Sequence, residues 1–127
     1  MTGALADLAD VSTHVEAAVV AEATSGGVVG STLEDGVRAE ELADAARRLL
    51  DEASAVRRGA RAWEAAAVTR TGALVVARDD DLLVGAVTHP EPPVRLVLYD
   101  LRTCLRALRS DLDSPLSRSW GDPNETD

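Results

Sequence analysis

The sequence predicts an α+β fold in which a five-stranded antiparallel sheet lies between helices. Short apolar or alternating segments come first as a pair and then as a group of three. Each group is followed by a longer segment with apolar residues at every third or fourth position. The expected order is therefore β-β-α-β-β-β-α, with a short additional helix at the front over Ala4–Asp10. Links within each group are too short for crossover connections, so consecutive strands pair antiparallel.

A chain of 127 residues suffices for one domain. We expect that domain over residues 1–112, followed by a mobile tail at 113–127, where Pro, Gly, Asn and acidic residues occur without periodicity. The first residues show neither the basic nor the apolar region of a signal peptide. The single cysteine, Cys104, cannot form an intramolecular disulfide, which favours a reducing compartment. We therefore expect a cytoplasmic protein.

The net charge of the chain is −9, and every basic residue is an arginine. Nucleic acid and anionic membranes would repel such a chain, so neither is expected as its main partner. No apolar run is long enough to span a bilayer, and no membrane insertion is expected. The chain has no Phe, one Tyr and two Trp, so its core depends on Ala, Val and Leu. Because small side chains bury little area each, such a domain gains from covering a further face with a partner.

The first pair of strands is predicted at Thr13–Ala23 and Val28–Ser31, joined by a turn at Thr24–Gly27. Alternation divides the first strand into two faces: Val15, Ala17, Val19 and Ala21 on one, and Glu16, Ala18, Val20 and Glu22 on the other. The centre of the strand is apolar on both faces, which indicates a sheet covered on both sides.

The first long helix is predicted over Val37–Arg57. Asp35 is suited to cap its start, and Arg57, Arg58 and Gly59 form a basic last turn followed by a helix-ending glycine. Apolar residues recur at steps of three and four and form one stripe, namely Leu42, Ala45, Ala46, Leu49, Ala53 and Val56.

The second group of strands is predicted at Trp63–Thr69, Ala73–Ala77 and Leu82–Thr88, as an antiparallel meander. A last helix follows over Pro93–Leu112, and a proline suits the first turn of a helix. Its apolar stripe comprises Val94, Val97, Leu98, Leu101, Leu105, Leu108 and Leu112. Four arginines lie mostly off that stripe, namely Arg95, Arg102, Arg106 and Arg109.

No catalytic, cofactor-binding or metal site is predicted. Asp79–Asp81 lacks the ligand spacing of a calcium loop and is interpreted as a solvated turn. His14 and His89 are too few for a metal site and are expected at the surface, at strand ends. Cys104 has no neighbouring histidine in sequence and is expected to be buried and inert. Gly26–Thr32 lacks the lysine and the following helix of a phosphate-binding loop.

Two features leave alternatives open. Trp63 is either an ordinary core aromatic residue or an anchor of an interface at the head of an alanine-rich strand. The arginines of the last helix form either a solvated face or a surface for an acidic partner.

The pattern of Val15–Ser31 followed by the long helix, and the stretches Thr71–Ala77, Asp79–Asp81 and Leu82–Val87, resemble the roadblock / dynein light chain family. The resemblance covers about residues 4 to 112. It implies a sheet with the long middle helix on one face and the terminal helices on the other. This chain departs from the family at Thr24–Gly27, where family members often carry an Asp-Gly-type turn.

The resemblance also implies a homodimer in which the middle helices pack together and the third strands pair edge to edge. The expected interface residues are Leu42, Ala46, Leu49, Ala53, Trp63, Ala65 and Ala67. Family members commonly act as non-catalytic regulators or scaffolds of small Ras-like GTPases, including bacterial ones. The expected function is therefore a homodimeric adaptor of a small GTPase, without a cofactor. The alternative is a small-molecule sensor of profilin-like or PAS-like architecture, although no convergent polar cluster is predicted on the inner faces.

Overall fold

The computed structural model describes residues 2–11, 13–56 and 62–113. Its elements are α1 (Thr2–Val11), β1 (Val15–Glu22), β2 (Val28–Ser31), α2 (Gly36–Val56), β3 (Glu64–Thr69), β4 (Gly72–Arg78), β5 (Leu82–Thr88) and α3 (Val94–Asp113). The predicted order and fold class are confirmed, and the front helix α1 is longer than the one or two turns expected. The predicted helix ending at Arg57–Gly59 and the tail after Asp113 lie outside the described residues.

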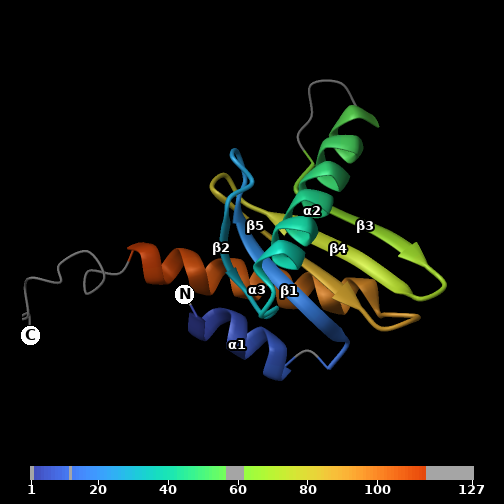
Figure 1. Cartoon of the computed structure of the whole chain (residues 1–127), viewed down its shortest axis with the longest axis horizontal. Coiled ribbons are helices and arrows are strands. Elements are labelled where there is room, and N and C mark those ends of the chain that lie inside the picture. The colour runs from blue at the N-terminus through green and yellow to red at the C-terminus, as the bar shows by residue number, and fades with distance from the viewer. Residues whose placement is uncertain (1, 12, 57–61, 114–127) are drawn as a thin grey trace, which may run out of the picture.

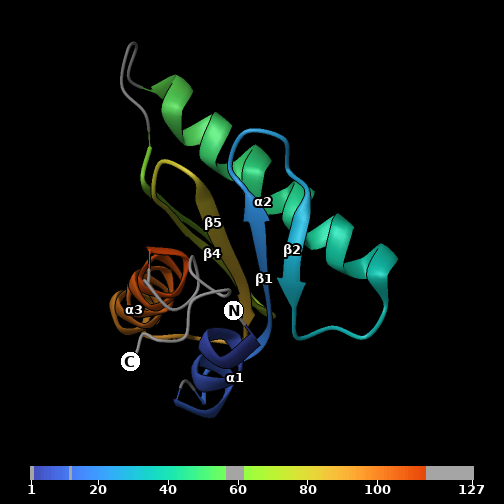
Figure 2. The same cartoon turned by 90° about the vertical axis from the view of Figure 1, so that its left-hand side faces the viewer.

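The described elements form three layers, with α2 on one face of the sheet and α1 and α3 on the other (Figures 1 and 2). The strand order is β2-β1-β5-β4-β3, and every neighbouring pair is antiparallel. Pairing of β1 with β5 joins the first hairpin to the meander. As a result, β3 forms one edge of the sheet and β2 the other.

The core on the α3 side is formed by aliphatic side chains from both layers. Val97, Leu101 and Leu108 of α3 are fully buried against the sheet. The strands contribute buried side chains to this core, namely Ala18, Val20, Ala73, Val75, Ala77, Leu82, Val84 and Ala86. The alternation predicted for β1 is thus confirmed at its centre, because Ala18 and Val20 face α3 whereas Val19 and Ala21 face α2.

The first residue of β1 departs from that alternation. Val15 was predicted on the same face as Val19, but it packs with the α3-side core. The register between β1 and β5 shifts between Val15 and Ala17. An extra residue at such a bulge moves the preceding side chain to the other face of the strand.

Helix α2 faces the sheet with small side chains. Its buried residues are Ala39, Ala43, Ala46 and Leu50. A Cβ atom built at Gly85 of β5 would lie 2.8 Å from the Ala46 Cβ atom, so glycine there allows α2 to approach the sheet closely. The side of α2 that faces the sheet therefore differs from the predicted apolar stripe. Of the residues in that stripe only Ala46 is buried, and Val56 is 86% exposed. The physical reason is that a closely packed helix fits alanine, not leucine, over Gly85.

The start of α2 is capped as predicted. The Asp35 side chain accepts hydrogen bonds from the backbone N–H groups of Val37 (2.9 Å) and Arg38 (3.4 Å). Such a cap satisfies N–H groups that have no partner within the helix. In the described part of the chain, no helix combines the length and the apolar character needed to cross a membrane.

Candidate protein-interaction surface

The outer edge of β3 presents backbone groups that pair with no other strand of the described sheet. The backbone N–H of Arg78 donates to the carbonyl of Trp63 at 2.9 Å, and the two residues continue the register in which Glu64 opposes Ala77. In an antiparallel pair, hydrogen-bonded positions alternate with positions whose N–H and C=O point away. The backbone groups of Glu64, Ala66 and Val68 therefore point out of the sheet. An open edge of this kind is a template for pairing with another strand.

Both faces of β3 are poorly covered within one chain. On the α2 side, Ala65 is half-buried and Ala67 is exposed. On the α3 side, Ala66 and Val68 are exposed, and Val68 retains 62% of its accessible surface. An apolar residue such as Val68 at an open sheet edge is a liability unless another chain covers it.

A flank of α2 adds further apolar surface. Its residues are Leu42, Ala45, Leu49, Ala53 and Val56. At about 100° per residue, they lie within an arc of about 80°, about 90° from the centre of the sheet-facing side. We call them the α2 flank.

The α2 flank faces β3 and not β2. Leu42 and Leu49 are half-buried and pack with Ala65 in one cluster. On the opposite side of α2, Arg47 donates to the Ser25 carbonyl in the β1–β2 turn at 3.2 Å. The α2 flank and the edge strand β3 therefore form one continuous surface.

The structure brings together three of the residues predicted for the interface, because Leu42 and Leu49 of the α2 flank pack in one cluster with Ala65 of β3. Ala53 is half-buried on the same flank, and Ala67 lies exposed on the same face of β3 as Ala65. Ala46 differs, because its side chain is fully buried in the chain's own core. It sets the depth of α2 on the sheet and offers no free surface.

Trp63 precedes β3 and is not a core residue. Its side chain is 43% exposed, and the Arg78 guanidinium lies over its ring, 5.8 Å from the ring centroid. This distance is within the range of a cation–π contact. The core alternative for Trp63 is therefore wrong, and its role as an interface anchor stays a prediction.

Sequence reasoning did not single out Ala66 and Val68 as interface residues, and it did not foresee the contacts that Arg102 makes with the start of β3. The first two occupy the alternate positions of a strand whose other face had been singled out, and the alternation itself was the available signal. Arg102 of α3 holds the start of β3 in place: its Nε donates to Glu64 Oε2 at 2.8 Å, its Nη1 to the Arg78 carbonyl at 2.8 Å and its Nη2 to the Trp63 carbonyl at 3.0 Å. These contacts join residues far apart in sequence, and no local pattern could reveal them.

The two histidines meet because β1 and β5 are antiparallel neighbours. The backbone N–H of His89 donates to the backbone carbonyl of His14 at 3.0 Å. The ring nitrogen Nδ1 of His89 lies 2.8 Å from Glu16 Oε2. His89 is exposed and His14 half-buried at a strand end. Among the described residues, no three His, Cys, Asp or Glu side chains are placed to hold a metal ion.

Asp79 organises the β4–β5 turn. Its carboxylate accepts hydrogen bonds from the backbone N–H groups of Asp81 and Leu82, each at 2.8 Å. The interpretation of Asp79–Asp81 as a turn is therefore confirmed.

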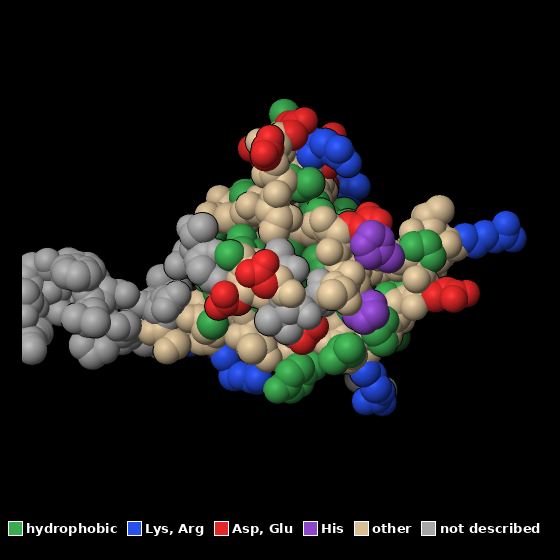
Figure 3. All heavy atoms as spheres, turned by 90° about the horizontal axis from the view of Figure 1, so that it is seen from below, with side chains coloured by type: hydrophobic (Ala, Val, Ile, Leu, Met, Phe, Trp, Pro, Cys, Tyr) green, Lys and Arg blue, Asp and Glu red, His purple; other side chains and the backbone are tan. Residues whose placement is uncertain are grey.

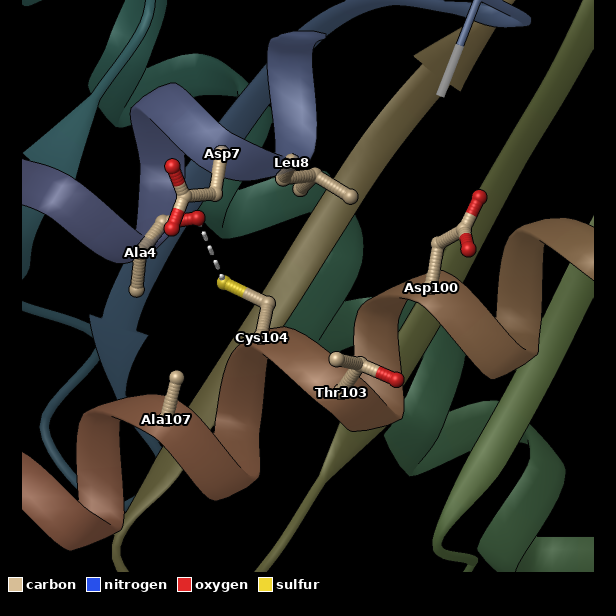
Figure 4. Close-up of a pocket in the computed structure, with 7 residues that line it drawn as sticks. All are labelled: Ala4, Asp7, Leu8, Asp100, Thr103, Cys104 and Ala107. Atoms are coloured by element: carbon tan, nitrogen blue, oxygen red, sulfur yellow. Dashed lines mark hydrogen bonds between the residues drawn. The ribbon is translucent and has the colours of Figure 1, made fainter. Parts of the chain in front are cut away.

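Cys104 lies beside a small cavity between α1 and α3 (Figure 4). The cavity has a volume of about 100 Å³ and is lined by Ala4, Asp7, Leu8, Asp100, Thr103, Cys104 and Ala107. The thiol lies 3.7 Å from the Ala4 carbonyl oxygen. Burial, followed by the Asp7 carboxylate, raises the pKa of Cys104 to about 11, so the thiol stays protonated at neutral pH. The predicted burial of this cysteine is confirmed.

Solved structures share this fold at low sequence identity. A Roadblock/LC7 domain from Streptomyces avermitilis matches with a TM-score of 0.76 at 16% identity, over 88% of this chain and 97% of that one. The gliding protein MglB from Thermus thermophilus matches with a TM-score of 0.69 at 16% identity, over 84% of each chain. MglB from Myxococcus xanthus matches with a TM-score of 0.62 at 9% identity, over 88% of this chain and 90% of that one.

The sequence itself matches no family model and no curated protein. The chain has the roadblock fold, as the resemblance implied.

Proposed function

We propose that this chain is a non-catalytic, cytoplasmic adaptor that dimerises through β3 and regulates a small Ras-like GTPase. The observation that carries the proposal is the position of β3: it is an edge strand, with outward backbone groups at Glu64, Ala66 and Val68 and apolar side chains on both faces. The GTPase part rests on the resemblance to the roadblock family. The dimer part rests on this edge and the α2 flank beside it.

The geometry of β3 favours one register for the dimer. Two copies related by a twofold axis pair antiparallel, and only positions with outward backbone groups can exchange hydrogen bonds. The register with the most pairs places Ala66 opposite Ala66 of the second copy. It places Glu64 opposite Val68 and Ala65 opposite Ala67. This arrangement extends the sheet across both chains.

The same register accounts for the alanines on the α2 side. Each chain contributes Ala65 and Ala67 to the centre of the joined sheet, where no side chain is larger than a methyl group. The α2 helices of the two chains can therefore pack closely on the joined sheet beside the twofold axis, with Leu42 and Leu49 buried between them. Burying each leucine fully contributes about 1.5–3 kcal/mol relative to leaving it exposed, and somewhat less here because both are already half-buried.

In the proposed complex, the paired α2 helices form a surface that neither chain has alone. A GTPase contacts both chains at once, and the rigid platform favours one nucleotide state of its partner by binding it more tightly. The regulation is steric and conformational. We assign no catalytic residue on this chain.

The test is binding of purified Ras-like GTPases encoded in the same genome, loaded with GDP or with a non-hydrolysable GTP analogue, by isothermal titration calorimetry. We expect one GTPase to bind with at least about tenfold preference for one nucleotide, which corresponds to about 1.4 kcal/mol. The Ala66→Pro variant, designed to be monomeric, is expected to lose this binding. No binding by any such GTPase would contradict the regulatory part, and undiminished binding to a monomer would contradict the composite surface.

The sensor alternative gains no support from the cavity beside Cys104. Its volume of about 100 Å³ is below the roughly 300–1,000 Å³ of pockets that hold small-molecule ligands. Among the described residues its lining is mainly apolar and holds two carboxylates, Asp7 and Asp100, with no basic group to balance them.

A further inference from the structure

Helix α3 concentrates positive charge on its outward side. Arg95, Tyr99, Arg102, Arg106 and Arg109 follow one another at steps of three and four and occupy an arc of about 80° at about 100° per residue. We call these residues the arginine stripe. Asp100 points about 100° or more away from each of them, toward α1, where it lines the cavity beside Cys104. Between Arg95 and Ser110, α3 therefore places no acidic residue on the arc of the stripe.

The stripe stands out because the chain as a whole is acidic, with a net charge of −9. Figure 3 shows acidic side chains in the middle of the face seen from below and arginines projecting at its lower rim. A basic strip on an acidic protein creates a local field that attracts anionic groups.

A groove of about 480 Å³ runs along the C-terminal half of the stripe. It is lined by Asp79, Arg102, Leu105, Arg106, Arg109 and Ser110. The Asp79 carboxylate already accepts two backbone hydrogen bonds within the β4–β5 turn. Its orientation is therefore set by its own loop, and its charge remains, so the lining of the groove combines three arginines with one carboxylate.

The three arginines differ in the hydrogen bonds and ion pairs that their guanidinium groups make within the chain. Arg102 donates three hydrogen bonds to Glu64, Arg78 and Trp63 and is a structural group. The Arg109 guanidinium pairs with Asp81 in a solvent-exposed ion pair, the kind that contributes little stability and exchanges readily. Arg106 is exposed, and its guanidinium donates to the Thr103 hydroxyl at 3.3 Å.

We propose that this groove binds an acidic peptide segment of a partner protein. One carboxylate of the segment pairs with Arg106, and a second pairs with Arg109 in exchange for Asp81. The guanidinium fork accepts a carboxylate with two parallel hydrogen bonds, which sets the orientation of the segment. The groove lies on the face of the sheet opposite α2. It therefore stays open in the proposed dimer, and the inference does not depend on that dimer or on a GTPase.

The experiment uses the full chain and a fluorescein-labelled 12-residue peptide of alternating Asp and Glu with one central Leu, followed by fluorescence anisotropy at low salt. A matched peptide with Asn and Gln in place of Asp and Glu is the first control. We expect only the acidic peptide to bind, and Arg106→Gln to weaken its binding about three- to tenfold. Arg70→Gln removes the same charge from the exposed β3–β4 turn and is expected to leave binding unchanged.

Three outcomes would overturn the proposal. If the acidic peptide does not bind, the stripe is only a solvated face. If Arg106→Gln and Arg70→Gln weaken binding equally, the attraction is unspecific. If deletion of residues 114–127, which include Asp122, Glu125 and Asp127, raises the peptide affinity several-fold, the occupant of the groove is the chain's own acidic tail and not a partner.

Discussion

Replacing Ala66 with proline is expected to separate the two copies without unfolding either. The backbone N–H of Ala66 points out of the sheet, away from β4, so the chain's own ladder does not use it. Proline is tolerated on edge strands when the missing N–H faces outward. In the proposed register, Ala66 opposes Ala66 of the second copy, and this pair exchanges two hydrogen bonds across the twofold axis.

The magnitude follows from that symmetry. The substitution removes both N–H donors of the central pair and leaves two carbonyl acceptors unpaired. At about 0.5–1.5 kcal/mol net for each hydrogen bond, and more where an acceptor is left buried, we expect a loss of about 2–4 kcal/mol. This corresponds to a dimer dissociation constant raised roughly 30- to 1,000-fold. The stability of the separated chain is expected to change by less than about 1 kcal/mol.

The matched control is Ala67→Pro. In the β3–β4 register Ala67 opposes Leu74 as a hydrogen-bonded pair, so proline there removes a bond within the chain. We expect Ala67→Pro to lower the free energy of unfolding by about 2–4 kcal/mol. Sedimentation velocity over a concentration series measures association, and circular dichroism with urea at low concentration measures stability. An Ala66→Pro chain that dimerises like the parent would refute β3 pairing, and one as unstable as Ala67→Pro would refute the assigned direction of its N–H.

Three further substitutions or conditions test other parts of the structure. Leu49→Asp places a charge on the half-buried α2 flank and is expected to weaken the dimer by about 2–3 kcal/mol in the same sedimentation assay, with the chain remaining folded. Gly85→Ala brings a methyl group to 2.8 Å from Ala46, which is expected to lower the urea-derived free energy of unfolding by about 1–3 kcal/mol; an unchanged value would contradict the close approach of α2. The raised pKa of Cys104, about 11 against 9.0, leaves stability unaffected below pH 9. Between pH 9 and pH 11 the unfolded chain loses its thiol proton first, and stability falls by up to about 3 kcal/mol relative to Cys104→Ala.

Apolar periodicity was sufficient to predict the elements of this fold but not the rotation of α2. Leu42 and Leu49 have the larger apolar side chains, so a stripe drawn through them has the stronger hydrophobic signal. The structure instead turns Ala43 and Ala46 toward the sheet, because Gly85 allows close contact there. The position of Gly85 under α2 depends on the pairing of β5 with both its neighbours. This pairing is a long-range property that no local pattern contains.

The position of β3 at the sheet edge illustrates the same limit. A meander of three strands leaves either its first or its last member outermost, and periodicity cannot decide between them. The family resemblance implied that the third strand is free, and the order β2-β1-β5-β4-β3 agrees. The exposure of Val68, by contrast, could have been anticipated from the strand itself. Ala66 and Val68 lie on the face of β3 opposite Ala65 and Ala67, and side chains on an edge strand are often exposed to solvent where no helix covers them.

The most direct test of β3 pairing is disulfide formation in an Ala66→Cys variant that carries Cys104→Ala. In a hydrogen-bonded antiparallel pair the Cα atoms lie about 5.5 Å apart, within the range that a disulfide can bridge. We expect mild oxidation to convert the variant to a covalent dimer on a non-reducing gel, whereas Val29→Cys on the opposite edge strand, β2, stays monomeric under the same conditions. Rapid crosslinking through Val29→Cys, with the Ala66→Cys chain left uncrosslinked, would contradict the account.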